Sequence, residues 1–294
     1  MNTLTNLYDE HSGKTSDKWA IYLREYEQKF EPYQNLAIKL LEIGIQNGGS
    51  LEIYSKYFPE AKRIIGCDIN PKCSNLRYDD PRIQVIVGDA NQPSIKAEVL
   101  KEEQFDIIID DGSHTSKDIV QSFCHYFPAL KEGGIFIVED LHCSYWNEFQ
   151  GGLFHPISSM NFFKRLVDIL NFESWGINKP AGSVLKTFLL NYDAAITEDD
   201  LLKIHSIEFA NSLCFIKKER PEKNLAGKRR VVGTEAMVEP IVQGLNGQAI
   251  QALDQSRNSF SSKTLLPEEE VLFLARENTK LKQEIENLKA ALKK

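Results

Sequence analysis

The stretch Phe105-Asp106-Ile107-Ile108-Ile109-Asp110, followed by Asp111-Gly112-Ser113-His114, decides the fold class of this chain. Its unbroken apolar run is typical of a strand that is buried on both faces of a parallel sheet. Similar runs occupy residues 40–43, 63–68, 83–87 and 134–138. Between residues 110 and 134, apolar side chains recur at helical spacing, which predicts a crossover helix that ends at Gly133-Gly134.

These alternating segments predict an α/β fold: a Rossmann-like, mostly parallel sheet with helices on both faces. Two more short runs, 207–209 and 213–216, flank Ala210-Asn211-Ser212 and predict a terminal antiparallel hairpin. We expect the α/β domain to occupy residues 35–219, after an N-terminal helical segment at 1–34 that covers the site. A linker at 220–266 and a coiled-coil helix at 267–294 follow it.

Composition excludes several classes of protein. The formal net charge of −7 argues against general nucleic-acid binding, which needs a basic surface. We find no apolar run of about 18 residues that would span a membrane, and the polar N-terminus lacks the layout of a signal peptide. The five cysteines form no CxxC pair, so we expect reduced thiols and a cytoplasmic location.

The loops that follow the strands carry the residues expected to bind a ligand, because ligands of open α/β sheets bind beyond the carboxyl ends of the strands. Glu42 opens the first loop, in which Gly44 and Gly48 allow tight turns, but the spacing is not GxGxxG. Asp68 ends the second strand and is suited to ribose hydroxyls, while Asp89 and Ala90 follow the third and suit an adenine. The ordered set predicts an adenosyl ligand without a pyrophosphate.

Acidic residues end the next two strands. Asp110 and Asp111 follow one, Glu139 and Asp140 follow its neighbour, and His114 lies close by. Up to four carboxylates would then converge, and they repel each other unless a cation intervenes. Oxygen ligands favour a hard ion such as Mg²⁺. Alternatively, Ser113 is the N-cap of a helix that starts at His114, and the later acids belong to a solvated loop.

The stretches LEIGIQNGGSL, IIGCDI, VGDA, FDIIIDDGSH and GGIFIVEDLHCSYW resemble class I S-adenosylmethionine-dependent methyltransferases. More narrowly, they are similar to the metal-dependent sugar O-methyltransferases of macrolide biosynthesis and the cephalosporin hydroxylase-like group. The resemblance covers roughly residues 8–216. It implies S-adenosylmethionine, Mg²⁺ or another divalent metal, and a sugar hydroxyl as acceptor, in a glycan or a glycosylated natural product. It places Asp111, Glu139 and Asp140 as metal ligands, His114 as general base and Asp110 toward the cofactor.

Several residues and functions remain open at this level. His142, Tyr145 and Trp146 are candidates for binding the acceptor, or are ordinary surface and core side chains. Lys18 and Trp19 either close over the cofactor or belong to a core stripe. An NAD-type oxidoreductase shares the sheet and the ribose acid, although the missing GxGxxG counts against it. A hydroxylase-like enzyme and a non-catalytic adenosyl-binding scaffold are also compatible with the pattern.

The C-terminal segment 271–292 carries a heptad repeat. Its a positions are Val271, Asn278, Ile285 and Leu292, and its d positions are Leu274, Leu281 and Leu288. β-Branched residues at a, leucine at d and one buried asparagine favour a parallel two-stranded coiled coil. The pattern predicts a homodimer or higher oligomer, with docking onto another partner or packing on its own domain as alternatives.

Overall fold

The computed structural model describes residues 3–101, 104–263 and 267–292; the side chains of residues 267, 268, 291 and 292 lie outside this description. Seven strands form one sheet in the order β3-β2-β1-β4-β5-β7-β6. They are β1 (Lys39–Ile43), β2 (Arg63–Asp68), β3 (Ile83–Val87), β4 (Phe105–Asp110), β5 (Leu130–Val138), β6 (Ile204–Ala210) and β7 (Leu213–Lys218). The strands β1 to β5 pair in parallel, and β7 and β6 add an antiparallel hairpin. The predicted Rossmann-like fold and terminal hairpin are confirmed.

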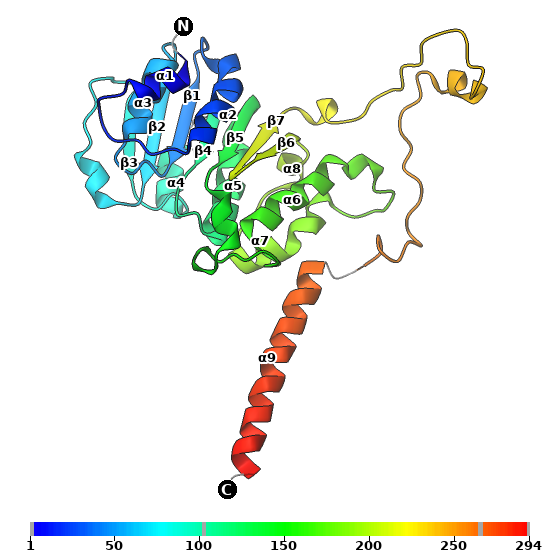
Figure 1. The fold of residues 1–294 in the computed structure, drawn as a ribbon. Coiled ribbons are helices and arrows are strands. Elements are labelled where there is room, and N and C mark those ends of the chain that lie inside the picture. Colours follow the sequence, from blue (N-terminus) through cyan, green and yellow to red (C-terminus); the bar gives the residue numbers. More distant parts are fainter. Residues whose placement is uncertain (1–2, 102–103, 264–266, 293–294) are drawn as a thin grey trace.

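Helices cover both faces of the sheet (Figure 1). Along the chain, the helices are α1 (Leu4–Asp9), α2 (Ala20–Phe30), α3 (Gly49–Tyr57), α4 (Pro93–Val99), α5 (Ser116–Tyr126), α6 (Ser159–Leu170), α7 (Lys186–Tyr192) and α8 (Glu198–Leu201). The last helix, α9 (Pro267–Leu292), projects away from the sheet (Figure 1). None of the helices in the described ranges is long and apolar enough to cross a membrane.

Two apolar cores lie on opposite faces of the sheet because successive side chains of a strand point in opposite directions. Ile108 contributes to the core on the α5 and α6 face, while Ile107 and Ile109 contribute to the core that contains α2 and α3. The aromatic stripe of α2, with Tyr22, Tyr26 and Phe30, is fully part of this second core. The N-terminal helices are thereby fixed on the same sheet whose strand ends form the site.

One boundary predicted from sequence is wrong. The crossover helix α5 ends at Tyr126 rather than at Gly133-Gly134, and β5 already begins at Leu130. Pro128 explains this, because it lacks the backbone N–H that would continue the helix. The two glycines lie inside β5, where Gly133 has a positive φ of 78°. The free, buried state of all five cysteines agrees with the expected reduced thiols.

Candidate active site

A cavity of about 400 Å³ lies beyond the carboxyl ends of the parallel strands. Its volume lies in the usual range for small-molecule sites. It brings together most of the residues predicted to bind a cofactor: Glu42, Gly44, Asp68, Asp89, Ala90 and Asp110 all line it. Gly48 is not among the lining residues. It precedes α3 with a φ of 78°, and its carbonyl accepts a hydrogen bond of 3.0 Å from the Tyr78 hydroxyl.

The loop after β1 is held tightly against its neighbours. Gly44 has a φ of 86°, and a Cβ atom there would lie 1.9 Å from the carbonyl oxygen of Asp111. The Asp68 carboxylate accepts hydrogen bonds of 2.9 Å from the backbone N–H groups of Ile45 and Gln46. Asp68 therefore fixes the shape of this loop, while it also faces the cavity where a ribose was predicted.

Asp110 lines the cavity with a carboxylate oxygen that has no hydrogen-bond partner among the described residues. Its side chain is buried, and burial raises its pKa to about 7. Oδ1 accepts a 3.3 Å hydrogen bond from the backbone of Gly112, whereas Oδ2 has no hydrogen-bond partner within the described ranges. A buried polar atom without a partner is costly, so a donor group on a bound molecule would stabilise it. This orphaned oxygen fits a cofactor that carries an amino group.

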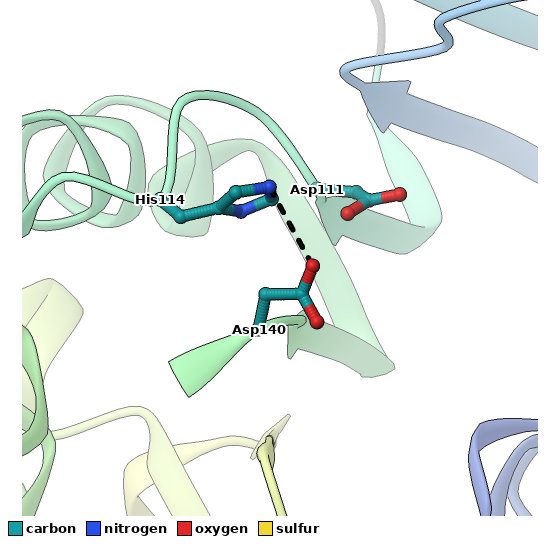
Figure 2. Close-up of side chains that lie close together, drawn as sticks. All are labelled: Asp111, His114 and Asp140. Carbon is teal, nitrogen blue, oxygen red and sulfur yellow. Dashed lines mark ion pairs between the residues drawn. The ribbon is translucent and has the colours of Figure 1, made fainter. Parts of the chain in front are cut away.

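Figure 2 shows Asp111, His114 and Asp140, which we call the open cluster. One ligand atom from each lies within 4.8 Å of the others, and all three side chains are about one-fifth exposed. His114 Nε2 is 3.5 Å from Asp140 Oδ2. The two carboxylates suit a hard divalent ion such as Mg²⁺ or Mn²⁺, and the imidazole lies beside them.

The backbone at the open cluster is unusual. His114 and Asp140 both have left-handed conformations, with φ values of 59° and 54°. Such conformations cost free energy in residues other than glycine and concentrate at functional sites. The alternative in which Ser113 caps a helix that starts at His114 is wrong. Helix α5 starts at Ser116, and Thr115 caps it by accepting a hydrogen bond from the backbone of Asp118.

A second group of acids, which we call the closed cluster, surrounds the ammonium of Lys18. Lys18 Nζ donates to Asp111 Oδ2 at 2.5 Å and to Glu139 Oε1 at 2.6 Å, and it lies 3.3 Å from Glu42 Oε1. The side chains of Lys18, Glu42 and Glu139 are at most 2% exposed. Burial alone would lower the pKa of Lys18, but the carboxylates of Glu139, Asp111 and Glu42 hold it well above its usual range.

The two acids that follow β5 therefore have different surroundings. Glu139 accepts hydrogen bonds from Lys18 and, at 2.5 Å, from the Tyr26 hydroxyl, and it does not line the cavity. Asp140 lines the cavity and accepts from the Tyr22 hydroxyl at 2.6 Å and from Trp19 Nε1 at 3.1 Å. Of the predicted metal ligands, Asp111 and Asp140 face the cavity, whereas Glu139 faces Lys18.

Tyr22 and Tyr26 are site residues that the sequence analysis missed. They project from α2 at a spacing of four residues and present their hydroxyls to neighbouring acids. The signal was the helical stripe of tyrosines, which we interpreted as core. A stripe that carries hydroxyls beside a predicted acidic cluster could have been assigned to hydrogen bonds with it, since buried tyrosines need a partner.

None of the predicted acceptor residues lines the cavity, but His142 and Trp146 lie next to the open cluster. His142 Nδ1 is 3.7 Å from Asp140 Oδ1 and 2.5 Å from the hydroxyl of Ser212. The ring of Trp146 contacts that of His142 at 4.9 Å between centroids. Tyr145 and Trp146 are 40% and 50% exposed. His142 and Trp146 form a partly exposed aromatic border beside Asp140.

The strand order and the cavity at the strand ends are those of a Rossmann-like methyltransferase fold. Residues 41–141 match a protein family described as a methyltransferase domain. That stretch runs from β1 to just past β5 and contains both acidic clusters except Lys18.

Within this class, the chain resembles sugar O-methyltransferases of antibiotic biosynthesis. It is 39% identical over 167 residues to 8-demethyl-8-alpha-L-rhamnosyl tetracenomycin-C 2'-O-methyltransferase of Streptomyces olivaceus, covering 53% of this chain and 43% of that protein. It is 34% identical over 188 residues to demethylmacrocin O-methyltransferase of Streptomyces fradiae, covering 59% of this chain and 45% of that protein. The matched part thus spans less than half the length of these relatives.

A solved structure has a similar fold. The MycE methyltransferase of the mycinamycin biosynthetic pathway, in complex with Mg and SAH, superimposes with a TM-score of 0.60 at 25% sequence identity. The superposition covers 79% of this chain and 58% of MycE. The common fold therefore extends well beyond the segment that matches the family.

Proposed function

We propose that this chain transfers a methyl group from S-adenosylmethionine to a sugar hydroxyl of a glycosylated small molecule, with a divalent metal that orients the acceptor. The observation that carries the proposal is the open cluster, in which Asp111, His114 and Asp140 meet at the rim of the cavity. The named activities of the curated relatives and the Mg and SAH in the MycE complex support it.

The proposed cofactor would lie in the cavity, with Asp68 facing its ribose, Asp89 and Ala90 its adenine, and Asp110 its amino group. S-Adenosylmethionine supplies an electrophilic methyl group on sulfur. The task of the chain is to hold the acceptor oxygen in line with that methyl group, which is a matter of positioning. The fixed loop around Gly44 and the orphaned Asp110 Oδ2 are the features that suit this ligand.

Asp111 and Asp140 would hold a divalent metal at the cavity rim, with Glu139 as a third ligand where Lys18 gives way, and the metal would lower the pKa of an acceptor hydroxyl. His114 would then take the hydroxyl proton, because its imidazole lines the cavity beside Asp140, 3.5 Å from Nε2 to Oδ2. Asp140 would hold the imidazolium that forms. The exposed rings of Trp19 and Trp146 border the same region and suit the apolar faces of a sugar.

Calorimetric titration of S-adenosylmethionine, with Mg²⁺ and with EDTA, tests the cofactor first. We expect binding under both conditions, because Asp68, Asp89 and Asp110 lie on the cofactor side of the cavity. Asp110→Asn should weaken this binding, whereas Asp140→Asn should not. Methyl transfer to rhamnosylated polyketides should then require the metal and disappear in Asp140→Asn. Binding of NAD in place of S-adenosylmethionine would contradict the proposal and favour an oxidoreductase.

The same assay separates a methyltransferase from a scaffold and from a hydroxylase-like enzyme. A scaffold would bind S-adenosylmethionine without transferring methyl groups to any acceptor. A hydroxylase-like enzyme would yield a product heavier by one oxygen atom, which mass spectrometry distinguishes from a methyl group. A cytoplasmic location remains a prediction from the composition.

We further propose that α9 joins two copies of the chain in a parallel coiled coil. Its a and d side chains Val271, Leu274, Leu281, Ile285 and Leu288 are 48% to 65% exposed in the single chain. In a parallel pair, Glu277 and Glu284 at g would face Lys282 and Lys289 at e of the partner, whereas an antiparallel pair would place like charges together. The side chain of Leu292 lies outside the described residues.

Light scattering after size exclusion tests this assembly. The full chain should be a dimer, and a chain truncated after Lys263 should be a monomer with the same affinity for S-adenosylmethionine. Leu281→Asp should give the same monomer without truncation, while Gln283→Asp, at an outward f position, should leave the dimer intact. An unchanged oligomer after truncation would contradict the coiled coil.

A further inference from the structure

The N-terminal strap, which we define as residues 11–19, crosses the rim of the cavity. Thr15 to Lys18 line the cavity, and the backbone N–H of Gly49 donates to the Thr15 carbonyl at 3.1 Å. At its start, Lys14 forms an ion pair of 2.5 Å with Glu52 of α3. At its end, Lys18 reaches the closed cluster. The strap is thus attached to the domain at both ends by ion pairs.

The ammonium of Lys18 occupies the position between two of the three predicted metal ligands. It lies 2.5 Å from Asp111 and 2.6 Å from Glu139, both of which the family resemblance assigns to the metal. Glu139 Oε1 also accepts the Tyr26 hydroxyl at 2.5 Å. A divalent ion between Asp111 and Glu139 would stand where the ammonium now stands, and two cations cannot share that space.

We propose that Lys18 is an internal cation of this site and competes with the divalent metal for Asp111 and Glu139. With Lys18 in place, its ammonium partly compensates the buried acids and the strap is closed over the cavity. When the metal binds Asp111 and Glu139, Lys18 leaves and the strap is released at its cavity end. Metal binding and strap closure then oppose each other. The inference rests on the proposed metal dependence and deepens it.

Electrostatics gives the direction of the expected effect. Removing a positive charge next to two carboxylates leaves them uncompensated, so a cation should bind them more tightly. Lys18→Met keeps the length of the side chain and removes its charge. Lys18→Arg keeps the charge. Lys14→Met removes a charge from the same strap, but that charge pairs with Glu52 rather than with the acids of the site.

Titration of Mn²⁺ into the full-length variants, followed by electron paramagnetic resonance, measures the competition directly. Lys18→Met should bind Mn²⁺ at least about tenfold more tightly than the wild-type chain, while Lys18→Arg and Lys14→Met should remain close to wild type. An unchanged or weaker affinity in Lys18→Met would overturn the proposal, as would an equal gain in Lys14→Met.

Hydrogen exchange of the strap gives a second readout that needs neither acceptor nor activity. Mn²⁺ should increase exchange of residues 11–19 in the wild-type chain, and Lys18→Met should show the increase without metal. If Mn²⁺ does not change the hydrogen exchange of the strap in the wild-type chain, the proposed competition is wrong. If Lys18→Met does not fold, Lys18→Met/Glu139→Gln removes one charge of each sign, and its strap should still exchange faster than that of the wild type.

Binding of SAH to the wild-type chain is measured alongside and separates the two proposals. Failure to bind SAH would remove the proposed function, whatever the metal titrations show. Normal SAH binding together with an unchanged Mn²⁺ affinity in Lys18→Met would leave the methyltransferase proposal standing and remove the role of Lys18.

Discussion

The open and closed clusters share Asp111 but differ in almost every other respect. In the closed cluster, Glu42 and Glu139 are buried around the ammonium of Lys18, and the Tyr26 hydroxyl donates a hydrogen bond to Glu139. In the open cluster, His114 and Asp140 are partly exposed at the cavity rim and have left-handed backbones. Neighbouring acids of one sequence motif thus have two different surroundings: one group is buried around a lysine, and the other is partly exposed at the cavity.

We expect the largest effect on activity from a substitution in the open cluster. His114→Ala should lower the rate of methyl transfer by about 10²- to 10⁴-fold, the range for loss of a general base. The free energy of unfolding and the affinity for SAH should change little, because His114 is partly exposed and borders the cavity. Steady-state rates with a rhamnosylated acceptor measure the effect. Retention of more than a tenth of the activity would argue against His114 as the base.

The next largest effect is a loss of stability from a substitution in the closed cluster. Glu139→Ala should lower the free energy of unfolding by about 2–4 kcal/mol, because it removes the buried hydrogen bonds that Lys18 and Tyr26 donate to Glu139. Urea denaturation measures this change. Asp140→Ala is the matched control at the neighbouring position, and it should cost clearly less because its carboxylate is partly exposed. Equal losses of unfolding free energy in the two variants would show that the two clusters contribute equally to stability.

The position of the acids, but not their division into two clusters, could be predicted from sequence. Strand periodicity located β1 to β5, and the rule that ligands bind at the carboxyl ends of parallel strands placed Asp68, Asp89 and Asp110 at one cavity. The periodicity of α9 likewise predicted its helix. These features depend on local patterns of residues, which a single sequence contains.

The remaining geometry depends on contacts between distant segments. Lys18 meets Asp111 and Glu139 across 93 and 121 residues of sequence, after α2 packs against the sheet. The backbone N–H of Glu139 donates to the Asp110 carbonyl at 2.9 Å and extends the pairing of β4 with β5. Asp140 then turns into a left-handed conformation, so that the two side chains diverge. Residue type alone did not indicate that turn.

A matched pair of tyrosines sharpens the comparison. Tyr26→Phe removes a buried hydrogen bond to a carboxylate of the closed cluster, and should cost about 1.5–3 kcal/mol of unfolding free energy. Tyr22→Phe removes a bond to the more exposed Asp140, and should cost about 0.5–1.5 kcal/mol. Urea denaturation of both variants tests the order. A larger loss in Tyr22→Phe would show that the open cluster also stabilises the fold.

The smallest effect is a pH dependence that must be separated from that of the clusters. His125 of α5 is partly buried, and burial lowers its pKa from 6.5 to about 4. The unfolded chain therefore binds a proton at this residue before the folded chain does, and the stability present above pH 6.5 is lost as the pH falls toward 4. The full shift would correspond to about 3 kcal/mol, which solvent screening of this partly exposed group reduces to about 1 kcal/mol. Urea denaturation between about pH 7 and 4.5 should show a shallower loss in His125→Gln than in the wild-type chain. If the free energy of unfolding falls equally with pH in both proteins, the acid sensitivity comes from the carboxylates of the two clusters instead.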